Sequence, residues 1–182
     1  RASFSLELVK TLGCDDGETA LELFTTPDEE ARAERVIEGG GAPSRGAGGE
    51  KGPLLVLAPG ASFGPSKCWS PESFAQVGDA ASRAGARVAV VGTRDESSLV
   101  AQVCDAMQEP SFELAGALDL GALKALIRRA AALVCNDAGA RHIAVAFGVP
   151  CVVLMGPTSL EKTDLNLEKV SVLQTDVSCR PC

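Results

Sequence analysis

A lysine in a loop of small residues is the first candidate for chemistry in this sequence. The segment PGASFGPSK places Gly60, Ala61 and Ser62 directly after an apolar run, and Lys67 follows a few residues later. Small residues let a ligand approach backbone N–H groups, a serine adds a hydroxyl, and a lysine supplies the point charge that a diphosphate needs. The same residues are equally typical of an ordinary strand-to-helix loop, so the loop alone leaves both interpretations open.

A second set of polar residues follows the apolar run ALVCN. Asp137 and Gly139 come directly after this run, and His142 lies one turn into the next predicted helix. Asp137 could accept hydrogen bonds from sugar hydroxyls, while the helix N-terminus and His142 face an anionic group. The structural alternatives are an N-cap for Asp137 and, favoured on the residues alone, a histidine on a partly buried helix face.

Two further segments could complete a nucleotide site. In VVGTRDES, Asp95 and Glu96 follow an apolar run, and a carboxylate at such a place can hold a ribose hydroxyl; an acidic first helical turn explains it equally. Leu118 offers an apolar surface for a base, although a core leucine is the simpler interpretation. Thr158 adds a hydroxyl in the tight loop MGPTS.

The elements that must position these residues follow a regular order from Leu54 onward. Short apolar runs begin near residues 54, 87, 112, 132, 150 and 170, with helical patterns at about 71–84, 96–108, 119–130 and 139–147. Continuous apolar strands that alternate with helices predict a doubly wound, Rossmann-like parallel sheet of the α/β class. Ligands bind such sheets beyond the carboxyl ends of the strands, where the candidate residues lie. Neither GxGxxG after a strand nor GxxxxGK[ST] occurs, which disfavours an NAD enzyme and a P-loop ATPase.

The first 52 residues differ from the rest. Helical patterns up to residue 38 are followed by a Gly-rich connector, GGGAPSRGAGGEKG. We therefore expect a separate segment that ends in a flexible linker over 1–52, and the α/β domain over 53–182.

Composition excludes several classes of protein. A formal net charge of -7 argues against a nonspecific nucleic-acid binder. No apolar run suits a bilayer span and no signal-like N-terminus is present, so we expect a cytoplasmic protein without a direct membrane anchor. Seven scattered cysteines do not suggest a disulfide framework; Cys135 and Cys151 are expected to be buried, and the pair Cys179 and Cys182 lacks further zinc ligands. No metal site and no cofactor are predicted.

Taken together and in this order, the motifs resemble the bacterial heptosyltransferases of glycosyltransferase family nine. The matching segments are PGASFGPSKCWSPESFA, VVGTRDE, LAG with LDLGALKALIRRAAALVCNDAGARHIAVAFGVP, VVLMGPTS and CRPC. Such enzymes transfer heptose from ADP-heptose to the inner core of lipopolysaccharide. The resemblance implies GT-B architecture, with this chain as its C-terminal half, truncated at its C-terminal end. Residues 1–52 would then be an inter-domain segment and linker, and 53–182 a nucleotide-sugar binding domain.

The resemblance also implies residue roles. Ser62 and Lys67 would hold the donor diphosphate, Glu96 the ribose, and Leu118 would lie near the adenine. The sugar and phosphate would be held by Asp137, Gly139 and His142. Transfer would be inverting and metal-independent, with Lys67 stabilising the leaving group.

The general base and most of the lipopolysaccharide acceptor site would come from an N-terminal domain that these residues do not include. We therefore expect the chain alone to bind nucleotide but not to transfer sugar. Cys68 and Ala138 replace an arginine and a serine that are common in the family, which could shift donor affinity or sugar preference. Two alternatives remain: a GT-B transferase that uses a UDP- or GDP-sugar, and a non-catalytic nucleotide-sugar-binding module.

Overall fold

The computed structural model describes residues 7–14, 20–38, 52–62, 64–159 and 166–179. Six parallel strands form one sheet in the order β3-β2-β1-β4-β5-β6. The strands are β1 (Leu54–Ala58), β2 (Arg87–Gly92), β3 (Phe112–Ala115), β4 (Ala132–Asn136), β5 (Cys151–Leu154) and β6 (Val170–Leu173). Each coincides with an apolar run of the sequence to within a residue or two, and the predicted Rossmann-like class is confirmed.

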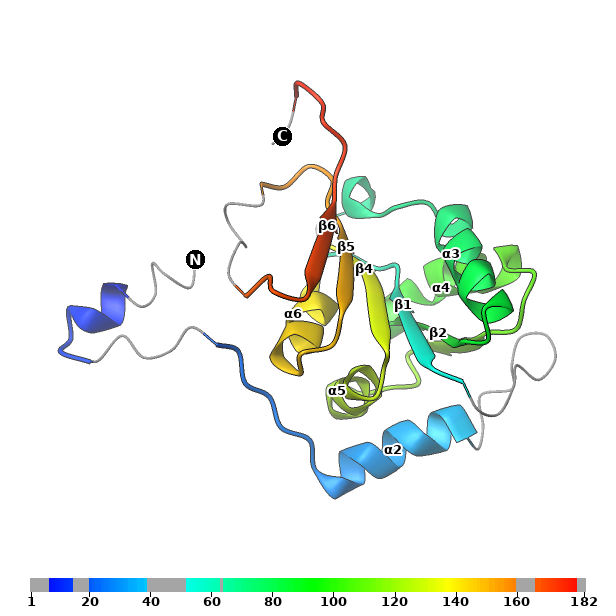
Figure 1. Ribbon diagram of the computed structural model, residues 1–182, viewed down its shortest axis with the longest axis horizontal. Coiled ribbons are helices and arrows are strands. Elements are labelled where there is room, and N and C mark those ends of the chain that lie inside the picture. The colour runs from blue at the N-terminus through cyan, green and yellow to red at the C-terminus, as the bar shows by residue number, and fades with distance from the viewer. Residues whose placement is uncertain (1–6, 15–19, 39–51, 63, 160–165, 180–182) are drawn as a thin grey trace.

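Helices cover both faces of the sheet, as Figure 1 shows. The longer helices are α2 (Pro27–Glu38), α3 (Pro71–Arg83), α4 (Ser97–Ala106), α5 (Leu120–Arg128) and α6 (Gly139–Ala146); two 3-10 turns are η1 (Pro65–Lys67) and η2 (Arg94–Glu96). One core cluster joins the sheet to α2, α5 and α6, and the other joins it to α3 and α4. Alternate strand residues enter alternate clusters, such as Val56 in the first and Leu57 in the second, which is why the strands read as unbroken apolar runs.

Helix α3 begins as its sequence predicts. Ser70 is the N-cap, its hydroxyl accepts a hydrogen bond from the backbone N–H of Ser73 at 3.2 Å, and Pro71 occupies the first turn. The chain direction at the end of the loop after β1 is thereby fixed.

Helix α2 lies in the predicted inter-domain segment and packs against α5, beneath it in the view of Figure 1. Its Ala33 and Ile37 are buried in the same cluster as the sheet. Glu30 accepts a hydrogen bond from Arg129 at 2.7 Å across this contact. Because partly exposed ion pairs contribute little stability, the two buried apolar side chains are the main attachment of α2. The domain boundary at residue 52 stays a prediction.

Candidate functional site

The candidate site lies at the centre of the sheet, where the strand order reverses. Strand β1 pairs with both β2 and β4, so the connections that leave β1 and β4 diverge to opposite faces. Such a switch point opens a crevice beyond the carboxyl ends of the strands. The loop 59–70 after β1 and the residues that follow β4 border this crevice, and they contain most of the predicted residues.

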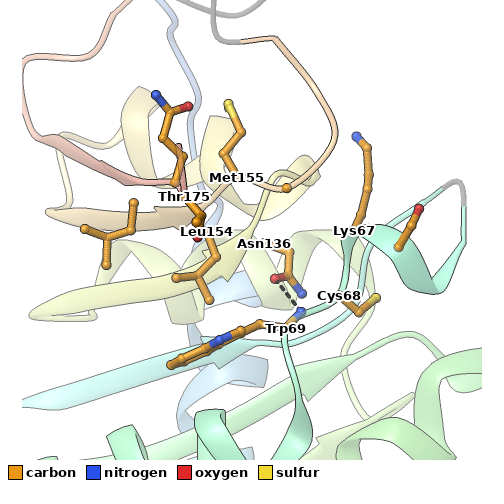
Figure 2. Close-up of a pocket in the computed structure, with 11 residues that line it drawn as sticks. Lys67, Cys68, Trp69, Asn136, Leu154, Met155 and Thr175 are labelled. Carbon is orange, nitrogen blue, oxygen red and sulfur yellow. Dashed lines mark hydrogen bonds between the residues drawn. The ribbon is translucent and has the colours of Figure 1, made fainter. Parts of the chain in front are cut away.

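Asn136, the last residue of β4, fastens both ends of the loop after β1. Its side chain is fully buried, its amide donates a hydrogen bond to the carbonyl of Pro59 at 2.6 Å, and its carbonyl oxygen accepts one from the N–H of Trp69 at 3.1 Å. Figure 2 shows the second of these bonds. The loop that carries Ser62 and Lys67 is therefore closed at its base by one side chain, a role that the sequence analysis missed.

A hollow of about 450 Å³, called here the larger hollow, unites four of the seven predicted residues. Its walls come from the loop after β1, the end of β2, the start of α5 and the start of α6. Ser62, Glu96, Leu118 and Gly139 all line it. Residues separated by up to 77 positions in the sequence thus meet around one volume, large enough for a small organic ligand.

Glu96 is held in this hollow by its own turn. Its Oε2 atom accepts hydrogen bonds from the backbone N–H of Thr93 at 2.8 Å and from the Thr93 hydroxyl at 3.1 Å. Gly60 lies against the same carboxylate, since a Cβ atom on Gly60 would stand 1.9 Å from Glu96 Oε1. The glycine is needed here for close approach rather than for an unusual backbone angle.

Lys67 and Asp137 form an ion pair beside the larger hollow. Lys67 Nζ lies 3.2 Å from Asp137 Oδ2, and the same oxygen accepts a hydrogen bond from the Thr158 hydroxyl at 2.9 Å. Burial raises the pKa of Asp137, but the hydrogen bond from Thr158 and the ammonium of Lys67 outweigh burial and lower it. Asp137 is therefore ionised at neutral pH. It is not the N-cap of α6, a position that Ala138 occupies without a side-chain cap.

Arg141 is a second cation on this carboxylate and was not predicted. It lies in the first turn of α6, is 1% exposed, and its Nη1 atom stands 3.6 Å from Asp137 Oδ1. The spacing of four residues could have indicated the pair, because side chains at i and i+4 can meet along a helix. Nothing in the sequence indicated that the arginine is buried.

His142 is not brought into the larger hollow with the others. It is exposed on α6, and partial burial of its ring together with the neighbouring Arg141 guanidinium lowers its pKa. It lines neither hollow described here, so in this conformation it stands outside the group formed by the other predicted residues.

A smaller hollow of about 380 Å³ is lined by Lys67 and Trp69 of the loop after β1 and by residues at the ends of β5 and β6. Figure 2 shows Lys67 and Trp69 pointing in different directions from their loop. The Trp69 ring packs edge-on against Phe74 of α3, with ring centroids 5.4 Å apart. Trp69 therefore joins the loop to the following helix.

Two of the cysteines are buried in the sheet, as the sequence predicts. Cys135 and Cys151 are buried on adjacent strands with their sulfur atoms 3.8 Å apart. The described residues contain no group of three or more His, Cys, Asp or Glu side chains that could hold a metal ion. Cys182, one half of the terminal pair, lies outside the described residues. No helix in the described part of the chain is long and apolar enough to cross a membrane.

The comparison with protein families decides the classification. The model of glycosyltransferase family 9 (heptosyltransferase) matches residues 4–182. The chain belongs to this family. The predicted family is thus confirmed, and the match includes α2 as well as the sheet.

Individual members of glycosyltransferase family 9 agree. A lipooligosaccharide heptosyltransferase 2 from Haemophilus influenzae is 32% identical over 126 residues, which are 67% of this chain and 36% of that protein. A solved family 9 glycosyltransferase from Veillonella parvula is 26% identical with a TM-score of 0.80, over 93% of this chain and 47% of the other. The Escherichia coli ADP-heptose LPS heptosyltransferase II shares the fold, with a TM-score of 0.75 at 24% identity, over 91% of this chain and 49% of that chain.

This chain matches only part of the length of each relative. It spans about half of the solved relatives and about a third of the curated relative from Haemophilus influenzae. The residues described above are therefore one part of a larger family architecture.

Proposed function

We propose that this chain is the donor-binding part of a heptosyltransferase, an inverting enzyme that transfers heptose from ADP-heptose to the lipopolysaccharide inner core. Membership of family 9 and the similarity to heptosyltransferase 2 proteins support the reaction. The observation that carries the proposal is the convergence of Ser62, Glu96, Leu118 and Gly139 on one hollow beside the Lys67–Asp137 pair.

The donor would extend across the crevice from the larger hollow to this ion pair. Leu118 offers an apolar surface for the adenine, and the Glu96 carboxylate accepts hydrogen bonds from the ribose hydroxyls. Lys67, Ser62 and the N-terminus of α6 attract the diphosphate, because each presents a positive charge or a donor. The sugar would then lie by Asp137 and Gly139, with His142 approaching it from α6.

We expect these residues to stabilise ADP as the leaving group. As the bond between heptose and phosphate breaks, negative charge grows on the departing ADP, and a lysine and backbone N–H groups already in place lower the energy of that state without a metal ion. The general base and the acceptor site would belong to the N-terminal domain. We therefore expect the isolated chain to bind the donor without transferring heptose, at a cytoplasmic location where the lipid-linked acceptor is made.

Calorimetric titration of ADP, UDP and GDP into the chain tests the proposal. ADP should bind more tightly than the other two, and Lys67→Ala should weaken ADP binding by about 1 to 3 kcal/mol, the usual range for a lost charged hydrogen bond. Asp105→Ala, an exposed carboxylate on α4, is the matched control and should leave binding unchanged. Tighter binding of UDP or GDP than of ADP would show that the donor is not ADP-heptose. An ADP affinity of Lys67→Ala equal to that of the unmodified chain would refute the placement of the diphosphate at Lys67.

A further inference from the structure

Arg141 is the most deeply buried charge in the described part of the chain, and none of the roles assigned above uses it. The residue is 1% exposed, and an arginine stays protonated in proteins. Removing a guanidinium from water costs several kcal/mol of desolvation free energy unless an opposite charge is paired with it. Arg141 therefore needs a carboxylate beside it. The carboxylate that it faces is Asp137, at 3.6 Å.

The Asp137 carboxylate has a separate cation for each oxygen. Oδ1 faces Arg141, while Oδ2 faces Lys67 at 3.2 Å and accepts the hydroxyl hydrogen bond of Thr158 at 2.9 Å. Two cations and one anion leave a net charge of one positive unit in this cluster. Such a cluster favours an anionic ligand nearby, and the N-terminus of α6 adds to the same field.

The two cations differ in their freedom to move. The side chain of Lys67 is 16% exposed and belongs to the loop after β1, whereas that of Arg141, on α6, is 2% exposed. A diphosphate bound at the crevice would attract the ammonium of Lys67 away from Asp137. Without Arg141, that movement would leave the Asp137 carboxylate, whose side chain is only 12% exposed, with no cation from the described residues paired to it.

We propose that Arg141 is a positioning residue, which keeps Asp137 ionised and in place so that Lys67 can pass from Asp137 to the diphosphate of the ligand. The inference rests on the proposed donor site and adds a residue to it. Arg141 itself does not touch the ligand. It acts by removing the energetic penalty that Lys67 would otherwise meet on leaving its partner.

The pH dependence of binding separates this role from a purely structural one. The probe is ADP-glucose, whose diphosphate has no titrating proton between pH 5 and 8. In the parent, Asp137 stays ionised whether or not Lys67 moves, so the affinity should be independent of pH. In Arg141→Gln, the departure of Lys67 favours protonation of Asp137, so binding should take up a proton and tighten as the pH falls.

Other titrating groups near Asp137 must be controlled. His142, the only histidine in the sequence, adjoins Arg141 in the chain and interacts electrostatically with Asp137, so every protein in the comparison carries His142→Gln. The hydrogen bond with Cys151 and burial raise the pKa of Cys135, so that this thiol stays neutral in the range. We expect Arg141→Gln to bind ADP-glucose on the order of tenfold more weakly at pH 8, with the difference narrowing toward pH 5. In Arg141→Lys, the affinity for ADP-glucose should again be independent of pH.

A second readout is independent of any ligand. The carboxyl carbon of Asp137, followed by NMR in the ligand-free chain, should titrate at higher pH in Arg141→Gln than in the parent. An unmoved titration, or an Arg141→Gln profile parallel to that of the parent, would overturn the inference. If Arg141→Gln does not fold, Arg141→Lys decides, since a pH-dependent affinity in that variant contradicts the proposal. If the unmodified chain, with His142 intact, binds no ADP-glucose, the result counts against the proposed function, while the NMR titration still tests Arg141.

Discussion

Gly60→Ala should destabilise the protein through one contact with Glu96. Gly60 is not among the residues with positive φ, so an alanine there meets no backbone strain. Its new Cβ would stand 1.9 Å from Glu96 Oε1 and 2.3 Å from Glu96 Cδ, which is impossible without movement. Because the carboxylate is the end of a flexible side chain, it will rotate away and lose its two hydrogen bonds to Thr93.

The magnitude follows from the lost capping contacts. A helix-capping interaction contributes about 0.5 to 2 kcal/mol, so Gly60→Ala should lower the free energy of unfolding by about 1 kcal/mol and Tm by roughly 2 to 4 °C. Urea unfolding followed by circular dichroism measures the first quantity. Gly139→Ala is the matched control, since a Cβ there meets nothing within 4 Å and stability should not fall.

A double-mutant cycle tests the cause. Glu96→Ala alone should cost about as much as Gly60→Ala, because both abolish the same contacts, and the double variant should cost little more than either single change. If Gly60→Ala is equally destabilising with and without the Glu96 side chain, the reasoning from this contact is wrong.

Three other predictions concern the loop after β1, the docking of α2 and a buried cysteine. Asn136→Ala should lower the free energy of unfolding by about 1 to 3 kcal/mol in urea titrations, since it leaves two buried backbone groups of the loop after β1 unpaired; a cost near zero would show that this side chain does not hold the loop. Burial raises the pKa of Glu30, but the hydroxyl and guanidinium groups around this carboxylate lower the pKa more. Ionised Glu30 therefore stabilises the docking of α2 fully above about pH 4.5, and this stabilisation is lost as the pH falls through the lowered pKa. Hydrogen-exchange protection of α2 should therefore drop on acidification before that of β1, and Arg129→Ala should reduce this difference, because it removes one of the groups that lower the pKa of Glu30. Burial raises the pKa of Cys104 to about 11, so at pH 8 it should resist iodoacetamide while exposed Cys14 reacts, and equal labelling of the two in the folded protein would contradict this.

The elements were predictable because their signals are local. Unbroken apolar runs gave the parallel strands, and Ser70 with Pro71 marked the start of α3 through short-range hydrogen bonding that any context preserves. The grouping of Ser62, Glu96, Leu118 and Gly139 was reachable as well, because parallel strands place all their carboxyl ends on one edge.

What could not be predicted depends on tertiary packing. Asn136 reads as an ordinary strand end, and its two hydrogen bonds exist only because β1 and β4 are neighbours. Arg141 reads as an exposed helical arginine, and its burial follows from how α6 lies on the sheet. The docking of α2 on α5 joins segments about 100 residues apart, which no local pattern shows.

A crystal structure of the chain with ADP-heptose tests the central claim most directly. The account predicts adenosine in the larger hollow, with the ribose at Glu96, the base beside Leu118, and Lys67 moved from Asp137 to the diphosphate. Adenosine density in the smaller hollow at Trp69, or a bound diphosphate with the Lys67–Asp137 pair unchanged, would contradict it.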